Sequence, residues 1–132
     1  MDDFWVDVYV NPSPVPTHVN QTWQMLSSQG LVWGVRSPAL PLAPNATLTL
    51  TMGDAYYFPL LSKFTGNLAL GTRVYAQVDS ANTNTTYGGV LENHEITGGA
   101  YNNISSTAVV AGSAAPQSPR TQDPARGKLP TR

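Results

Sequence analysis

The 132-residue sequence contains no cysteine and few charged side chains. The lack of cysteine excludes disulfide bonds, thiolate nucleophiles and cysteine-ligated zinc sites. Charged residues make up 11% of the chain, whereas an average soluble domain has about 25%, and the net charge at pH 7 is −1. Because phosphate binding requires clustered Lys and Arg, we expect no nucleic-acid partner.

Long apolar runs are also absent. The longest are a few residues, far short of the ~18 that cross a bilayer, so we expect no membrane span. The first residues have neither the basic region nor the apolar region of a secretory signal peptide. We therefore expect any export to depend on sequence outside this chain.

Charge divides the sequence near Ile104. Residues 1–104 carry a net charge of −4 and residues 105–132 one of +3. From residue 111 onward the chain is mainly Pro, Ser, Ala, Gly, Gln and basic residues, and Leu129 is its only large aliphatic side chain. Such a segment buries too little apolar surface to offset its ordering entropy. The sequence predicts one β domain over residues 1–104 and a disordered tail or linker over residues 105–132.

Alternation of apolar and polar residues with a period of two predicts five short strands. It is clearest at residues 47–52, where leucine alternates with threonine, and it recurs at residues 4–10 and 72–79. Residues 31–35 and 87–96 complete the set. Turns rich in Gly, Pro and Asn separate these segments, which favours an all-β, antiparallel β-sandwich.

The same alternation assigns side chains to two faces of the strands. The expected inward set is apolar: Phe4, Val6, Val8, Val10, Val74, Ala76 and Val78. The expected outward, solvated set is Trp5, Asp7, Tyr9, Tyr75, Gln77 and Asp79. Residues 17–29 are compatible either with one helical turn near Trp23 or with a loop that packs over the core.

Several short motifs resemble CARDB domains, which are immunoglobulin-like modules described as cell-adhesion-related in bacteria. Residues 74–79 (VYAQVD), the Asn-rich turn that follows, residues 90–95 (VLENHE) and the pair Asn102 and Asn103 resemble the last hairpin of that family. The opening FWVDVYV, the strand GLVWGV and the turn-strand LAPNATLTL are also similar to their counterparts in the family. The resemblance covers most of residues 4–104.

Two features depart from the family pattern. Two strands that normally precede the one at Phe4 are missing, and residues 96–101 are inserted where a compact Glu-rich ending is usual. The chain is thus either a divergent domain or a fragment that begins within the fold.

The resemblance implies a non-enzymatic adhesion, spacer or interaction module of a larger exported bacterial protein, located outside the cell or on its surface. The expected partners are neighbouring domains of the same chain, surface proteins or polysaccharide. No catalytic residue is expected, since the sequence has no Gly-x-Ser-x-Gly elbow and no glycine-rich phosphate loop. Glu92, His94 and Glu95 lack the spacing of a zinc site.

Two ligand hypotheses accompany this interpretation. A carbohydrate-binding accessory module would stack sugar rings on exposed aromatic side chains, for which the candidates are Trp5, Tyr9, Trp23 and Tyr75. A calcium-stabilised domain would use hard oxygen ligands from one hairpin. The candidates for calcium are Asp79, Asn82, Asn84 and Glu92, and no other cofactor is expected.

Overall fold

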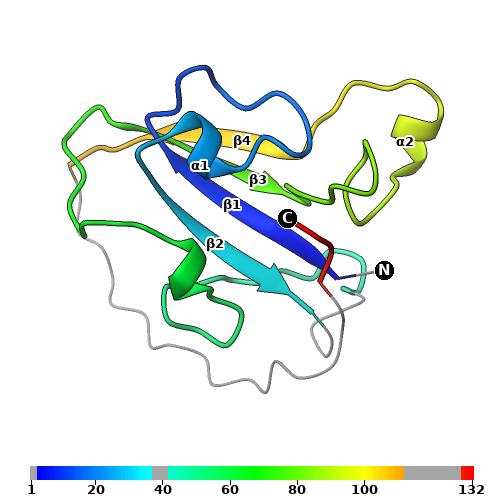
Figure 1. Cartoon of the computed structure of the whole chain (residues 1–132), viewed down its shortest axis with the longest axis horizontal. Helices are drawn as coiled ribbons and strands as arrows, with labels where there is room; N and C mark the ends of the chain where they lie inside the picture. Colours follow the sequence, from blue (N-terminus) through cyan, green and yellow to red (C-terminus); the bar gives the residue numbers. More distant parts are fainter. Residues whose placement is uncertain (1–2, 37–41, 112–128) are drawn as a thin grey trace.

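A four-stranded antiparallel sheet dominates the computed structural model, which describes residues 3–36, 42–111 and 129–132 (Figure 1). Its strands are β1 (Phe4–Val10), β2 (Gln29–Val35), β3 (Arg73–Val78) and β4 (Ile104–Ala108), in the spatial order β2-β1-β3-β4. The short helices α1 (Trp23–Leu26) and α2 (Asn93–Ile96) and the 3₁₀ turn η1 (Pro59–Leu61) lie in the connections. The expected all-β, antiparallel character is confirmed, and the described residues form one sheet.

Strand β1 is one of the two central strands of this sheet. It pairs with β2 on one side and with β3 on the other, so that Asp7 lies between Val32 and Gln77. Its residues are buried along almost the whole strand, as expected where side chains on both faces are covered. Asp7 is therefore held by the sheet in the interior of the protein.

Both faces of the sheet are covered by side chains. The first face carries the first core, which is formed by Phe4, Val6, Trp33, Val35 and Tyr56. The second face carries the second core, which is formed by Trp5, Tyr9, Trp23, Val32 and Ala81, with Phe58, Leu61 and Leu129 packed against them.

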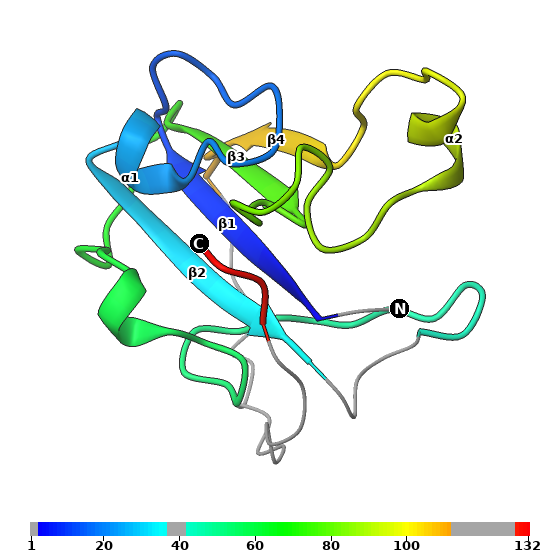
Figure 2. The same ribbon diagram turned by 45° about the vertical axis from the view of Figure 1, so that its right-hand side comes forward.

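The expectation of a solvated outward face is wrong for most of its members. The period of two is correct, but the second face is covered by α1, by η1 and by residues 129–132, which lie over β2 and beside β1 in Figure 2. As a result Trp5, Asp7 and Tyr9 are buried. Gln77 is buried beside His18 and Tyr101, and Asp79 is buried beside residues 89–90. On the expected inward side, by contrast, Val78 is 45% exposed.

The strand expected at residues 47–52 does not form. Its alternation persists, because Leu48 and Leu50 are half-buried against the first core while Thr47 and Thr49 are exposed. A strand also needs a neighbouring backbone for its hydrogen bonds, and no such ladder forms at these residues in the described parts of the chain. The pattern therefore marks which side chains face the core without marking a sheet member.

The strand expected at residues 87–96 is also wrong. Glu92 and Glu95 form a capping box, in which each side chain accepts a hydrogen bond from the other residue's backbone N–H, and this starts α2. The fourth strand is instead β4, whose Ser and Thr residues pair with β3. The sheet thus extends past residue 104, which the sequence predicts as the last residue of the domain. Residues 112–128 of the predicted tail lie outside the described residues.

The helical alternative for the segment near Trp23 is confirmed by α1. The outer edge of β2 is covered by the segment containing η1. The N–H of Phe58 donates to the Val32 carbonyl (2.9 Å), and Gly30 and Lys63 exchange two backbone hydrogen bonds. This pairing fixes the Phe58 side chain beside the second core.

Candidate functional site

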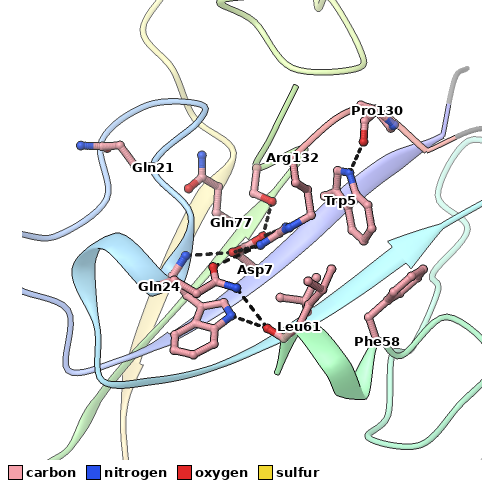
Figure 3. A network of polar contacts seen from close by, with 12 residues as sticks. Trp5, Asp7, Gln21, Gln24, Phe58, Leu61, Gln77, Pro130 and Arg132 are labelled. Carbon is pink, nitrogen blue, oxygen red and sulfur yellow. Dashed lines mark hydrogen bonds and ion pairs between the residues drawn. The ribbon is translucent and has the colours of Figure 1, made fainter. Parts of the chain in front are cut away.

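A buried carboxylate lies at the centre of the second face. The Asp7 side chain is 0% exposed and accepts hydrogen bonds from the backbone N–H of Trp23 (2.9 Å) and the Ser80 hydroxyl (2.6 Å). Arg132 adds two more, from Nη1 to Oδ1 (2.5 Å) and from Nη2 to Oδ2 (3.0 Å), as Figure 3 shows. A charge this deep is tolerated only when paired and hydrogen-bonded, and the planar guanidinium provides both.

Arg132 also packs on an aromatic ring. Its Cζ lies 4.9 Å from the centroid of the Trp5 ring, a cation–π arrangement, and its side chain is 11% exposed. The Trp5 ring in turn meets the edge of Phe58, with centroids 4.9 Å apart and an interplanar angle of 68°. The cation is therefore enclosed by a carboxylate and an indole.

The three residues before Arg132 lie on the same face. The indole Nε1 of Trp5 donates to the Pro130 carbonyl (2.6 Å), and the N–H of Thr83 donates to the Thr131 carbonyl (3.0 Å). Thr131 itself is exposed, whereas Leu129 and Pro130 are half-buried. Backbone and side-chain contacts thus hold residues 129–132, hereafter the docked segment.

Two glycines leave room for the docked segment. A Cβ at Gly34 would clash with the Leu129 side chain and with the Phe58 ring, and a Cβ at Gly89 would lie 2.9 Å from Cγ of Pro130. The absent side chains therefore form seats for Leu129 and Pro130. We call the surface beneath the docked segment the docking surface, defined by Trp5, Asp7, Gly34, Phe58 and Gly89.

The aromatic residues proposed for sugar stacking are not a platform of open rings. Trp5, Tyr9 and Trp23 are buried and Tyr75 is half-buried. Trp23 donates from Nε1 to the Leu61 carbonyl (2.8 Å), which fixes the ring inside the second core. The polar atoms of Trp5, Tyr9 and Trp23 find partners within the protein, as buried aromatic side chains usually require.

Tyr9 belongs to a second buried polar network beside Asp7. Its hydroxyl lies 2.6 Å from both Gln77 Oε1 and the Gln21 carbonyl, while Gln77 Nε2 donates to the His18 carbonyl (3.0 Å) and the Tyr101 hydroxyl (2.7 Å). Burial raises the pKa of Tyr101 to about 12 and that of Tyr9 well above its usual range. Both hydroxyls are therefore neutral at pH 7 and available as donors.

The structure does not gather the four candidate calcium ligands at one place. Both carboxylate oxygens of Asp79 accept backbone N–H groups, from Gly89 (2.7 Å) and Val90 (2.8 Å). Glu92 caps α2 and lies 3.3 Å from Nδ1 of His94. Among the described residues, no three His, Asp or Glu side chains form a group suited to a metal ion.

The other two candidates line a pocket beside the docked segment. Asn82 and Asn84 border a pocket of about 260 Å³ together with Asp3, Gly89 and residues 129–131. The Asn82 amide bonds the Gly88 carbonyl (2.9 Å) and the N–H of Asn84 (3.1 Å), so it shapes the turn. Neither Asp79 nor Glu92 lines this pocket.

Burial raises the pKa of Asp79 above its ordinary value of 3.8, although the N–H groups of Gly89 and Val90 oppose the shift. The folded protein therefore holds this proton more tightly than the unfolded chain does. Above pH 3.8, we expect the free-energy contribution of Asp79 to stability to fall as pH rises towards the folded-state pKa. Carboxyl carbon NMR should give a midpoint above 3.8, and a midpoint at or below 3.8 would contradict this.

Comparison with protein-family models, with curated proteins and with solved structures gives no match to this chain. No helix in residues 3–36, 42–111 or 129–132 is long and apolar enough to cross a membrane.

The pairing of Asp7 with Arg132 is not predicted by the sequence. An aspartate flanked by apolar and aromatic residues in a strand is a signal for either a solvated face or a buried, paired charge. The only sequence feature that favours a basic partner for Asp7 after position 104 is the opposite net charge of the two parts of the chain.

Proposed function

We propose that this chain is a non-enzymatic interaction module of the immunoglobulin-like, CARDB-like kind. In this proposal it belongs to a larger exported bacterial protein and acts outside the cell or on its surface. The order β2-β1-β3-β4 supports the fold assignment, because variable-type immunoglobulin sheets have the antiparallel order C′-C-F-G.

The module acts by binding an extended polypeptide segment at the docking surface. The observation that carries this proposal is the bidentate pairing of Arg132 with the fully buried Asp7 across 125 positions of sequence. Together with the seats at Gly34 and Gly89, it defines a ligand pattern of Leu, Pro, any residue and Arg. Extended segments are commonly recognised in this way, by backbone hydrogen bonds together with side-chain seats.

A peptide titration tests this function. The acceptor is the full chain carrying Leu129→Ser and Arg132→Gln, which weakens its own docked segment. A fluorescent peptide of sequence RGKLPTR, copied from residues 126–132, is expected to bind it saturably. A matched peptide ending in Lys keeps the charge but loses the bidentate fork, and it should bind about tenfold more weakly, the equivalent of about 1.4 kcal/mol.

Equal binding of the two peptides, or no binding to a folded acceptor, would contradict the proposal. Dispersed amide NMR signals establish that the acceptor is folded. If the double variant does not fold alone, Leu129→Ala serves as a milder acceptor. Its melting temperature should then rise with the Arg peptide more than with the Lys peptide, because a ligand that binds only the folded state stabilises it.

A further inference from the structure

The contacts of the docked segment do not depend on its being part of the same molecule. Its hydrogen-bond partners Trp5, Asp7, Gln24 and Thr83 are all far from it in sequence, and no contact of this segment described above is with a residue adjacent in the chain. An identical segment of another molecule would make the same contacts. Exchange of an identical element between protomers is a common route to association.

The connection to the docked segment is long enough for exchange. Residues 112–128 supply 17 residues between the end of the sheet region and the docked segment. At full extension, 17 residues span about 56–61 Å. A connection of this length does not by itself confine residues 129–132 to the docking surface of their own molecule.

Charge complementarity favours the same association. The part that carries the docking surface, residues 1–104, has a net charge of −4, and the part that carries the docked segment has one of +3. Opposite net charges attract in solution and speed the encounter. These charges favour the approach of the basic segment of one copy to the acidic part of another.

We infer that the docking surface of one copy binds residues 129–132 of a second copy, so that Arg132 of one molecule pairs with Asp7 of the other. This inference rests on the proposed function and names its partner. A segment tethered to its own surface has an effective concentration in the millimolar range. Separate wild-type molecules at micromolar concentration therefore stay closed, and exchange occurs where modules are held side by side.

A complementation experiment isolates the exchanged contact. The donor is the full chain with Gly34→Val, which fills the Leu129 seat and leaves residues 129–132 intact. The acceptor is the full chain with Leu129→Ser and Arg132→Gln, which leaves the docking surface intact. Each is expected to sediment alone as a monomer, and an equimolar mixture at about 0.1 mM to form a one-to-one dimer.

Two controls keep the result interpretable. Adding Arg132→Gln to the donor should abolish the dimer, which separates segment exchange from other association. If Gly34→Val does not fold, Asp7→Asn replaces it as donor, since it removes the buried charge with almost no change in size.

Folded donor and acceptor that stay monomeric when mixed would overturn the inference. If the acceptor nevertheless binds the Arg peptide, the proposed function stands and only exchange between copies is refuted. If the acceptor also fails to bind the peptide, the proposed function fails with it. Dimers in the mixture that survive Arg132→Gln in the donor would likewise refute the inference.

Discussion

Replacing Arg132 with Gln is expected to lower the free energy of unfolding by about 3 kcal/mol, because removal of one partner strands a buried charge. Asp7 is 0% exposed while Arg132 covers it, so the pair contributes as a buried pair and not as a surface ion pair. Ser80 and the N–H of Trp23 remain as donors to Asp7, which places the expected loss at the lower end of the range for buried pairs. Urea denaturation of the two proteins measures the difference.

A double-mutant cycle assigns this loss to the pair. Combining Asp7→Asn with Arg132→Gln should cost about 2 kcal/mol less than the sum of the single substitutions, because each removes the same interaction. Arg73→Gln, at an exposed position of β3, is the matched loss of a positive charge and should change stability by less than about 0.5 kcal/mol. Additive single effects would show that Asp7 and Arg132 are not coupled.

Replacing Gln77 with Leu is expected to destabilise the fold by about 3 kcal/mol, since buried polar groups that lose their partners cost about 1–3 kcal/mol each. Gln77 is 0% exposed. Its amide bonds Tyr9, Tyr101 and the His18 carbonyl, and leucine of similar size satisfies none of them. The His18 carbonyl and the Tyr101 hydroxyl both lose a donor.

The same change at an exposed glutamine provides the comparison. Gln24→Leu replaces an exposed side chain of α1 whose two hydrogen bonds, to the Leu61 carbonyl (3.2 Å) and from Arg132 (3.5 Å), are long and solvent-exposed, so its effect should stay within about 0.5 kcal/mol. Chemical denaturation of both variants at one pH measures the contrast. Equal losses for Gln77→Leu and Gln24→Leu would rule out the buried network as a source of stability.

The local signals of the sequence located three strands and left the helical turn near Trp23 as one of two alternatives. Period-two alternation identified β1, β2 and β3, because in each of them the pattern is uninterrupted and turn residues lie at both ends. The same signal at residues 47–52 did not produce a strand, since sheet membership depends on a neighbouring backbone as well as on side-chain pattern. At residues 87–96, the capping box of Glu92 and Glu95 starts the helix α2 in place of the expected strand. Alternation of apolar and polar residues does not reveal such a cap.

The candidate site was much less predictable than the strands. Whether Trp5 and Asp7 face solvent depends on what covers the second face, and the covering groups come from α1, η1 and residues 129–132. Arg132 pairs with Asp7 over 125 positions, a separation at which a single sequence carries no periodic signal. The tail was predicted from the average composition of residues 105–132. Docking depends instead on the four residues 129–132, which an average over the segment does not single out.

The most direct test of this account is a nuclear Overhauser spectrum of the wild-type chain with the methyl groups of Leu129 assigned. The account predicts cross-peaks from these methyls to the α protons of Gly34 and the ring of Phe58, and slow exchange of the Trp5 indole proton that donates to Pro130. Random-coil shifts for residues 129–132, with no such cross-peaks and a freely exchanging Trp5 indole, would contradict it.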